Sequence, residues 1–439
     1  MRRIQNLRRP MMVLATFLMF LAVPATGGEA EAEAVAIGWV KAFNSGVVET
    51  MGRFRAKHFR LSTASDWRET FAQMVDHLGT IQVVGVLIEA PGEVTLVIQS
   101  KPGQRRMTFR FDPEQPDQIQ KITLEAGEDS QMDLPDLQLT SGNWPDRSRE
   151  LNGYLKDLAE RDLFSGNVMI IERGEVRFEG AYGLASREFN VSNTLKTRFD
   201  VGSFNKDYTR LAILQLLAKG KLALSDTVGE YLPDYPNAEV RKEVSIQHLL
   251  DHRSGLGDYF TDEYFETPMR KLRNVDDYIP IWGPKALEFE PGSREQYSNF
   301  GYTVLGAIIE KISGRSYFDY VERNIFRPAG MHDTGFFETD RPEPNVAVGY
   351  THMDPKGEQS EDLYKNIYLE PAQGGPWGKS YSTVHDLYRF FEAMFENRLL
   401  PEEHNWLRRG WDTGGIALAG GGPGLNAFMG LEDGRMILV

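Results

Sequence analysis

The sequence predicts a mixed α/β (α+β) protein: an antiparallel sheet flanked by helices, with an inserted helical region, preceded by a small α+β domain. Three observations favour this fold class. Strand-like segments occur near both ends of residues 148–439, helical patterns dominate residues 199–326, and a separate run of helices and then strands occupies residues 30–126. Strands that are distant in sequence and separated by helices are expected to join one sheet.

The N-terminus is typical of a secretory signal peptide, predicted over residues 1–25. An uncharged, mostly apolar run from Met11 to Val23 follows a basic start, and "AVPATGG" offers small residues for cleavage after Ala25 or Gly27. We therefore expect an exported protein, periplasmic or secreted. An uncleaved membrane anchor is the alternative, although the run is short for a span.

The net charge and the absence of cysteine exclude several classes of function. The chain of 439 residues has a net charge of −14, which argues against a nucleic-acid-binding surface. It contains no cysteine, so disulfides, a thiol nucleophile and cysteine-ligated zinc are excluded.

Residues 30–126 are expected to form the small α+β domain. Helices are predicted over Val35–Phe59 and Trp67–Leu78, and three strands follow within "IQVVGVLIEA", "EVTLVIQS" and "RRMTFRF". The preceding acidic residues 29–34, "EAEAEA", are predicted to be a solvated leader. The element order and "WVKAFNSG" resemble nuclear-transport-factor-like (NTF2-like) domains. A polar segment over residues 127–147, rich in Gly, Pro and Asp, is predicted to be a linker.

The second domain, residues 148–439, is expected to begin with a helix and a hairpin. The helix is predicted over Leu151–Arg161, and the hairpin turns at Arg173-Gly174. A late helix is expected over Thr383–Asn397, and two final strands flank Asp433-Gly434. No internal repeat is present.

Ser203 and Lys206, in "FDVGSFNKDYTRLAILQLLAKGKL", form the one Ser-x-x-Lys of the chain. Residues three apart on a helix share a face, so the two side chains can meet. A mostly apolar stretch from Tyr208 to Leu217 predicts a buried helix with Ser203 at its first turn. The free N–H groups there favour a developing alkoxide, and burial favours an uncharged, basic Lys206. Ser203 is therefore a candidate nucleophile, although a simple helix-capping serine would leave the same pattern.

Three further segments accompany this pair. They are "VSIQHLLDHRSGLGDYF" (244–260), "PGSREQYSNFGYTVLGAIIEKISGRSYFDYVERNIFRPAGMHDTGF" (291–336) and "AGGGPGLNAF" (419–428). Together with the Ser-x-x-Lys they resemble the superfamily of serine β-lactamases and penicillin-binding proteins, nearest to its class C branch with related D-aminopeptidases and esterases. The resemblance covers residues 151–439 and implies an acyl-enzyme serine hydrolase with no metal or organic cofactor.

The resemblance also implies roles for individual residues. Ser203 matches the acylated nucleophile and Lys206 the proton acceptor beside it. Tyr297 matches the tyrosine that passes a proton to the leaving group, and Asn299 the asparagine that holds Lys206 and the substrate amide. A second Tyr-x-Asn at Tyr364–Asn366 is predicted to be a surface loop.

The third signature of the superfamily, a basic residue, a small residue and glycine on an edge strand, is incomplete here. Alignment on Pro423-Gly424 places Leu418-Ala419-Gly420 at this site, and a rival register uses "DTGG" from Asp412. Gly420 and Gly421 can still present backbone, with the N–H groups of Ser203 and Gly421 as an oxyanion hole. The missing cation weakens the case for carboxylate-bearing β-lactams and D-Ala-D-Ala peptides. An esterase or amidase fits, as does a degenerate relative that only binds cell-wall peptides or other ligands.

Two further features complete the expectations. Members of the superfamily usually continue past a strand such as "RMILV", so the end at Val439 suggests a truncated domain. His248 and His252 have the spacing of a helical metal pair, but no glutamate follows the first histidine, so we expect no metal. We expect a small-molecule or peptide substrate with an ester or amide bond as the partner.

Overall fold

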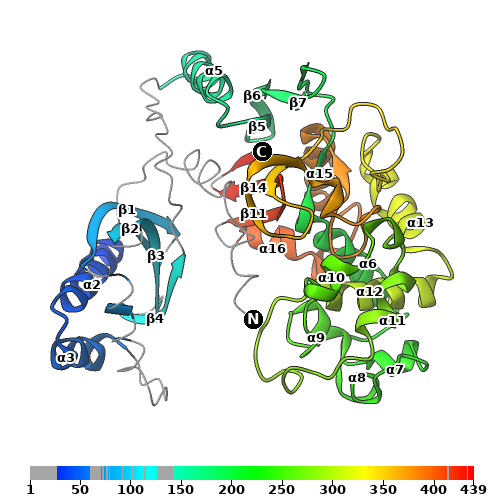
Figure 1. Cartoon of the computed structure of the whole chain (residues 1–439), viewed down its shortest axis with the longest axis horizontal. Helices are drawn as coiled ribbons and strands as arrows, with labels where there is room; N and C mark the ends of the chain where they lie inside the picture. Colours follow the sequence, from blue (N-terminus) through cyan, green and yellow to red (C-terminus); the bar gives the residue numbers. More distant parts are fainter. Residues whose placement is uncertain are drawn as a thin grey trace. The chain divides into compact units, whose positions relative to one another are not determined.

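A computed structural model of the chain describes residues 27–59, 80–90, 92–100, 103–112, 115–125, 142–412, 415–432 and 434–439, with Phe71, Met74, Val75 and Leu78. They belong to two compact units, one within residues 18–134 and one within residues 135–439, and Figure 1 shows their elements. The predicted signal peptide, residues 1–25, falls outside the described residues. Within the described ranges, no helix is long and apolar enough to cross a membrane.

The N-terminal unit packs two helices, α2 (Gly27–Asn44) and α3 (Val48–His58), with a four-stranded antiparallel sheet. The sheet has the order β1-β2-β3-β4, with strands Gln82–Ala90, Glu93–Ser100, Gly103–Asp112 and Gln115–Glu125. Alternate residues of β2 and β3 point into a core that also holds Trp39 and Phe43 of α2. The predicted strands are present, and β4 is an additional strand.

The helices of this unit differ from the prediction. The single helix expected over Val35–Phe59 is broken at Gly46, whose φ of +63° ends α2 before α3 begins. Residues 29–34 are helical, and Ala32 is buried, so this segment is not a solvated leader. The helix predicted over residues 67–78 falls largely outside the described residues. The likeness to NTF2-like domains stays a prediction.

The C-terminal unit is built around a five-stranded antiparallel sheet of order β13-β14-β15-β5-β6. Its strands are Ile416–Gly422, Leu425–Glu432, Arg435–Leu438, Gly166–Glu172 and Glu175–Tyr182. The pairing of β15 with β5 joins segments from opposite ends of the unit, which confirms the expected sheet (Figure 1). Arg173 and Gly174, both with positive φ, make the tight turn between β5 and β6.

Two details of this sheet region differ from the prediction. Three strands, not two, follow residue 415, because β13 precedes the hairpin of β14 and β15. Helix α5 runs over Trp144–Glu160, with the Asn143 side chain accepting a hydrogen bond from the backbone N–H of Asp146. Residues 144–147 of the predicted linker are therefore helical, because Asn143 caps the helix earlier than the apolar pattern indicates.

Between β6 and β13 helices and short strands predominate. The longest are α6 (Asn205–Ala218) and α12 (Asn299–Ser313), which pack against each other. The short strands are β7 (Leu184–Ser186), β8 (Val191–Ser192), β9 (Phe199–Asp200), β10 (Tyr350–Met353), β11 (Gln359–Lys365) and β12 (Tyr381–Ser382). The other helices and turns are η1 (Gly202–Phe204), α7 (Val228–Tyr231), α8 (Ala238–Glu243), α9 (Ile246–Leu250), α10 (Asp262–Glu266), η2 (Met269–Lys271), α11 (Val275–Trp282), α13 (Tyr317–Val321), η3 (Glu322–Phe326), α14 (Arg327–Ala329), η4 (Asn366–Tyr368), α15 (Val384–Phe395), η5 (Glu402–His404) and α16 (Trp406–Asp412).

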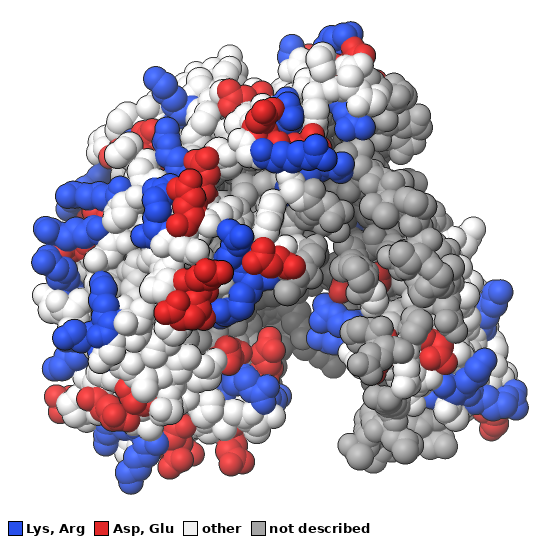
Figure 2. All heavy atoms as spheres, turned by 180° about the vertical axis from the view of Figure 1, so that it is seen from behind, with Lys and Arg blue, Asp and Glu red and all other residues white. Residues whose placement is uncertain are grey.

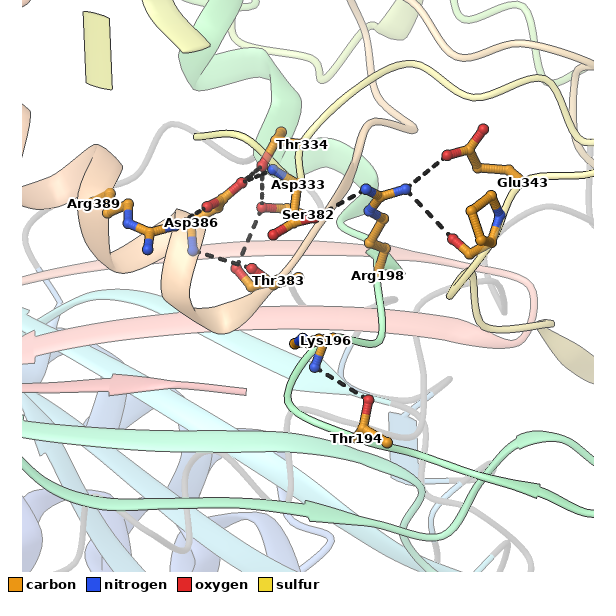
Figure 3. A network of polar contacts seen from close by, with 11 residues as sticks. Thr194, Lys196, Arg198, Asp333, Thr334, Glu343, Ser382, Thr383, Asp386 and Arg389 are labelled. Carbon is orange, nitrogen blue, oxygen red and sulfur yellow. Dashed lines mark hydrogen bonds and ion pairs between the residues drawn. The ribbon is translucent and has the colours of Figure 1, made fainter. Parts of the chain in front are cut away.

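Strand β9, which leads to Ser203, is held by a polar network (Figure 3). Arg198, just before β9, donates to carboxylates of Asp333 at 2.9 Å and Glu343 at 2.7 Å. The buried carboxylate of Asp386 accepts from the Thr334 hydroxyl, which also contacts Ser382 of β12. Because β9 pairs with β12, these contacts hold the strand that directly precedes the Ser203 turn in position.

Charges at the surface are mixed in sign. On the face shown in Figure 2, Lys and Arg side chains are interspersed with Asp and Glu. Such a surface provides no single-sign field on that face for steering a polyanion.

Candidate active site

Ser203 lies in the short turn η1, directly between β9 and helix α6. Gly202, with a φ of +53°, lets the chain reverse there, and its N–H donates to Asp200 Oδ1 at 2.8 Å. The next helix, α6, is buried along much of its length, as predicted, and Phe204 and Tyr208 anchor its start in the core. The serine is thus presented at the start of a fixed helix.

Lys206 extends from the first turn of α6 to three oxygen atoms. Its Nζ lies 3.1 Å from Ser203 Oγ and 2.6 Å from Asn299 Oδ1, and it also contacts the backbone oxygen of Trp377. The lysine is 6% exposed. Two of these oxygens can only accept, whereas the serine hydroxyl can also donate. An uncharged Lys206 therefore satisfies all three contacts by donating to Asn299 and Trp377 and accepting from Ser203.

Tyr297 and Asn299 reach the same place from the start of helix α12. The Tyr297 hydroxyl donates to Ser203 Oγ at 2.7 Å, and the phenol ring lies under the Lys206 amine with Nζ 4.8 Å from the ring centre. The His252 ring packs on that of Tyr297 with centres 4.5 Å apart, which holds the phenol in place. All four predicted catalytic residues are therefore in one connected set of contacts.

Asp258 belongs to this set although the sequence reasoning did not single it out. Asn299 Nδ2 donates to Asp258 Oδ2 at 2.8 Å, which fixes the amide so that its oxygen faces Lys206. Burial raises the pKa of Asp258, and the positive charge of Lys206 partly offsets that rise. Asp258 is thus a buried carboxyl group whose ionised form is favoured by the charge of Lys206.

Strand β13 brings glycine backbone against the serine turn. A Cβ atom at Gly420 would fall 1.9 Å from the Val201 oxygen and 2.8 Å from the Ser203 nitrogen. A Cβ atom at Gly202 would fall 2.6 Å from the Gly421 nitrogen. Only glycine allows the strand and the turn to come this close. The nitrogen atoms of Ser203 and Gly421 both lie where β13 contacts the turn.

Leu418 lies on the same face of β13 as Gly420, because alternate residues of a strand share a face. Its side chain is partly buried and packs against the hydrophobic core. The rival register is wrong, because Asp412 is the last residue of helix α16 and not part of an edge strand.

A second lysine, Lys379, lies buried behind the serine turn. Its Nζ is 3.5 Å from Glu370 Oε2 and 3.9 Å from Asp200 Oδ2. Burial raises the pKa of Asp200 to about 7, lowered in part by Lys379 and raised further by Glu370, and burial also raises the pKa of Glu370. A lone lysine in the glycine-rich "GGPWGKS" is the one signal of this cluster in the sequence.

The two histidines do not form a helical metal pair. His248 Nδ1 accepts from the N–H of Ser245 in a capping arrangement, and His252 lies beyond α9 with a φ of +56°. His252 Nδ1 accepts from the N–H of Ser298 at 3.2 Å. Among the described residues, no group of three or more His, Cys, Asp and Glu side chains is placed to hold a metal ion.

The second Tyr-x-Asn is not a surface loop, contrary to expectation. Tyr364 belongs to β11, and Asn366 is buried and donates to the backbone oxygen of Pro423 at 3.0 Å. The amide of Asn366 thus supports the end of β13, because the turn after that strand needs a donor for its carbonyl.

An antiparallel sheet with an inserted helical region, and a serine between a lysine and a tyrosine at its edge, define the fold and site of β-lactamase-type serine hydrolases. The chain belongs to the beta-lactamase family, which matches residues 151–430. The predicted family and fold class are thereby confirmed.

Relatives agree with this assignment. A putative penicillin-binding protein, PbpX of Bacillus subtilis (strain 168), is 34% identical over 259 residues, which are 59% of this chain and 61% of that protein. A teichoic acid D-alanine hydrolase of Staphylococcus aureus is 25% identical over 261 residues, 58% of this chain and 61% of that protein. The chain thus spans about three fifths of the length of these relatives.

A solved structure shares the fold. The penicillin-binding protein of Bacillus halodurans superposes with a TM-score of 0.57 at 28% identity, and the match covers 64% of this chain and 93% of that one. The family match over residues 151–430 includes the residues of the candidate site.

Proposed function

We propose that this protein is an exported serine hydrolase that cleaves an ester or amide bond through an acyl-enzyme on Ser203. The observation that carries the proposal is the contact of Ser203 Oγ with both Lys206 Nζ, at 3.1 Å, and the Tyr297 hydroxyl, at 2.7 Å. Export rests on the signal-peptide pattern of residues 1–25.

The proposed reaction has two steps. Ser203 Oγ attacks the carbonyl carbon while its proton passes to uncharged Lys206, and the oxygen of the tetrahedral intermediate takes hydrogen bonds from the N–H groups of Ser203 and Gly421. Collapse breaks the bond to the leaving alcohol or amine, which receives a proton from Tyr297, and Lys206 passes the serine proton on to Tyr297. Water then attacks the acyl-enzyme, releases the carboxylic acid and returns a proton to Ser203.

The charges around the site favour a substrate without a carboxylate. Lys206 has Asp258 nearby, and Lys379 lies between Asp200 and Glu370, so three carboxyl groups accompany two lysines. Lys379 therefore does not replace the cation missing at Leu418. Because one relative is named a teichoic acid D-alanine hydrolase, a D-alanyl ester, which carries an amine and no free carboxylate, is the first substrate to test.

Covalent labelling tests the proposal. The purified protein is incubated with a fluorophosphonate and, separately, with a fluorescent penicillin, and intact mass is measured. We expect a fluorophosphonate adduct that is lost in Ser203→Ala and at least about 100-fold slower in Lys206→Ala. The exposed Ser293→Ala is the matched control and should label normally.

A non-catalytic module that binds cell-wall peptides or other ligands is the second candidate. Leu418, at the place of a substrate-binding cation, favours it. Folded protein that forms no adduct with either probe, yet binds peptidoglycan fragments in calorimetry, would replace the hydrolase proposal with this one.

A further inference from the structure

Lys379 combines three features that are individually unfavourable. It is 3% exposed, it carries a charge, and its φ of +68° is one that side chains other than glycine and asparagine rarely adopt. Such a residue persists where the surrounding structure requires its side chain. The surroundings of the buried ammonium indicate what its side chain is required for.

The Lys379 ammonium lies between two carboxyl groups. One belongs to Asp200, at the turn that carries Ser203, and the other to Glu370, beside strand β13. Asp200 holds the N–H of Gly202, the residue before Ser203. Glu370 lies beside the other partner, because a Cβ atom at Gly422 would fall 3.0 Å from Glu370 Oε1. Lys379 Nζ is within 4 Å of both carboxyl groups, at 3.9 Å and 3.5 Å.

The backbone around Lys379 completes this connection. Its N–H donates to the oxygen of Gly202 at 3.2 Å, so Gly202 is held through its N–H by Asp200 and through its oxygen by Lys379. Two residues earlier, the oxygen of Trp377 accepts from Lys206. The polar network of Figure 3 restrains β9 and β12 in addition, through Arg198 and Ser382.

We propose that Lys379 is a positioning residue for the reaction, whose ammonium ties the Ser203 turn to strand β13 and so sets the spacing of the Ser203 and Gly421 N–H groups. This inference rests on the proposed function. Lys379 touches neither substrate nor Ser203 Oγ in this role. It acts through Asp200 on the turn and through Glu370 on the strand, and no cation at Leu418 is needed for that purpose.

The test is the rate of fluorophosphonate labelling at saturating probe. In this step Ser203 Oγ bonds to phosphorus, fluoride leaves, and the serine proton is taken up by Lys206, while the phosphoryl oxygen occupies the place of the oxyanion. We expect Lys379→Gly to lower the first-order labelling rate constant at least about tenfold, with the half-saturating probe concentration changed less than about threefold. Glycine accepts the φ of +68° without strain, so the backbone is preserved.

Controls separate positioning from stability. Arg173→Gly removes a charged residue of positive φ from an exposed turn and should label at the wild-type rate. Lys379→Arg keeps the charge and should recover part of the lost rate. A variant that is only destabilised would have a lower melting temperature and a smaller fraction of labelled protein. A folded variant with a mispositioned site would be labelled completely but slowly.

The outcomes are distinct. Wild-type protein that is not labelled at all would overturn the proposed function and this inference with it. Labelled wild type with an unchanged rate in folded Lys379→Gly would overturn the inference alone. If Lys379→Gly does not fold, Glu370→Gln tests the same tie at its β13 end, where an unchanged labelling rate would equally contradict it.

Discussion

The amide group of Asn299 donates a hydrogen bond of 2.8 Å to the buried carboxyl group of Asp258, while its oxygen accepts one of 2.6 Å from Lys206. Asp258 therefore acts on Lys206 in two ways. It orients the amide oxygen, and its negative charge stabilises the ammonium that forms when Lys206 takes the serine proton.

Substitution of Asp258 can separate these two effects. Asp258→Asn retains an acceptor for the Asn299 amide but removes the charge, so we expect kcat to fall about tenfold, or ~1.4 kcal/mol. Asp258→Ala removes both and should cost roughly 10- to 100-fold, as expected for loss of a hydrogen bond to a charged group. Steady-state hydrolysis of an activated ester measures both; equally reduced activity of the two variants would show that only the charge matters and that the hydrogen bond to Asn299 contributes nothing.

Gly420→Ala is predicted to disable the site without removing a functional side chain. The new methyl group would overlap the Val201 oxygen, at 1.9 Å, and push β13 away from Ser203. Loss of one oxyanion donor typically costs about 100- to 1,000-fold in kcat, and we expect a loss of that size.

The matched control for this change is Gly153→Ala in helix α5, where no atom lies within 4 Å of the new Cβ. Alanine there should raise the free energy of unfolding by ~0.5–1 kcal/mol and leave kcat unchanged. A Gly420→Ala variant with normal kcat would exclude close contact between β13 and the serine turn during catalysis.

Much of this site follows from the sequence, because Ser203 and Lys206 are three residues apart on one helix and Tyr297 and Asn299 adjoin the start of another. The remaining partners come from tertiary approach, which local patterns do not encode. Lys206 meets the Trp377 oxygen across 171 residues of chain, and any residue type could supply a backbone oxygen. Asp258 lies in the segment 244–260 that carries part of the resemblance, but nothing local marks its carboxyl group as the partner of Asn299.

The fold, like the site, was predicted from the sequence in part. Two strand-like segments joined at Arg173-Gly174 predicted the hairpin of β5 and β6, and strands at both ends of the unit predicted the shared sheet. Element ends were less accurate, since α5, capped by Asn143, begins at Trp144, seven residues before the predicted Leu151, and Gly46 splits the first long helix. Caps and positive φ values override the hydrophobic period at such points.

Asp200 predicts a pH dependence of stability. Its pKa is raised to about 7 in the folded protein by burial, well above the usual range of an aspartate. The folded state therefore binds the proton more tightly, and the free energy of unfolding contributed by this group falls as pH rises from about 4 to about 7. Asp200→Asn should flatten that slope in urea unfolding between these pH values. Parallel slopes in the two proteins would contradict a buried, titrating Asp200.

Leu418 gives the sharpest test of substrate choice. Leu418→Lys places an amine on the face of β13 that carries Gly420, beside Ser203, where a substrate carboxylate could pair with it. We expect acylation by a fluorescent penicillin to become about tenfold faster, which corresponds to ~1.4 kcal/mol for one partly solvated ion pair. Labelling by the uncharged fluorophosphonate should change little, because it lacks a carboxylate.

Ala419→Lys is the control, since the neighbouring residue points to the opposite, exposed side of the strand. It adds the same charge to the same strand but should leave penicillin acylation at the wild-type rate. If both variants accelerate acylation equally, general electrostatic attraction explains the effect. If neither does, the lost cation is not what limits reaction with carboxylate-bearing substrates, and the explanation must lie with the carboxyl groups that surround Lys379.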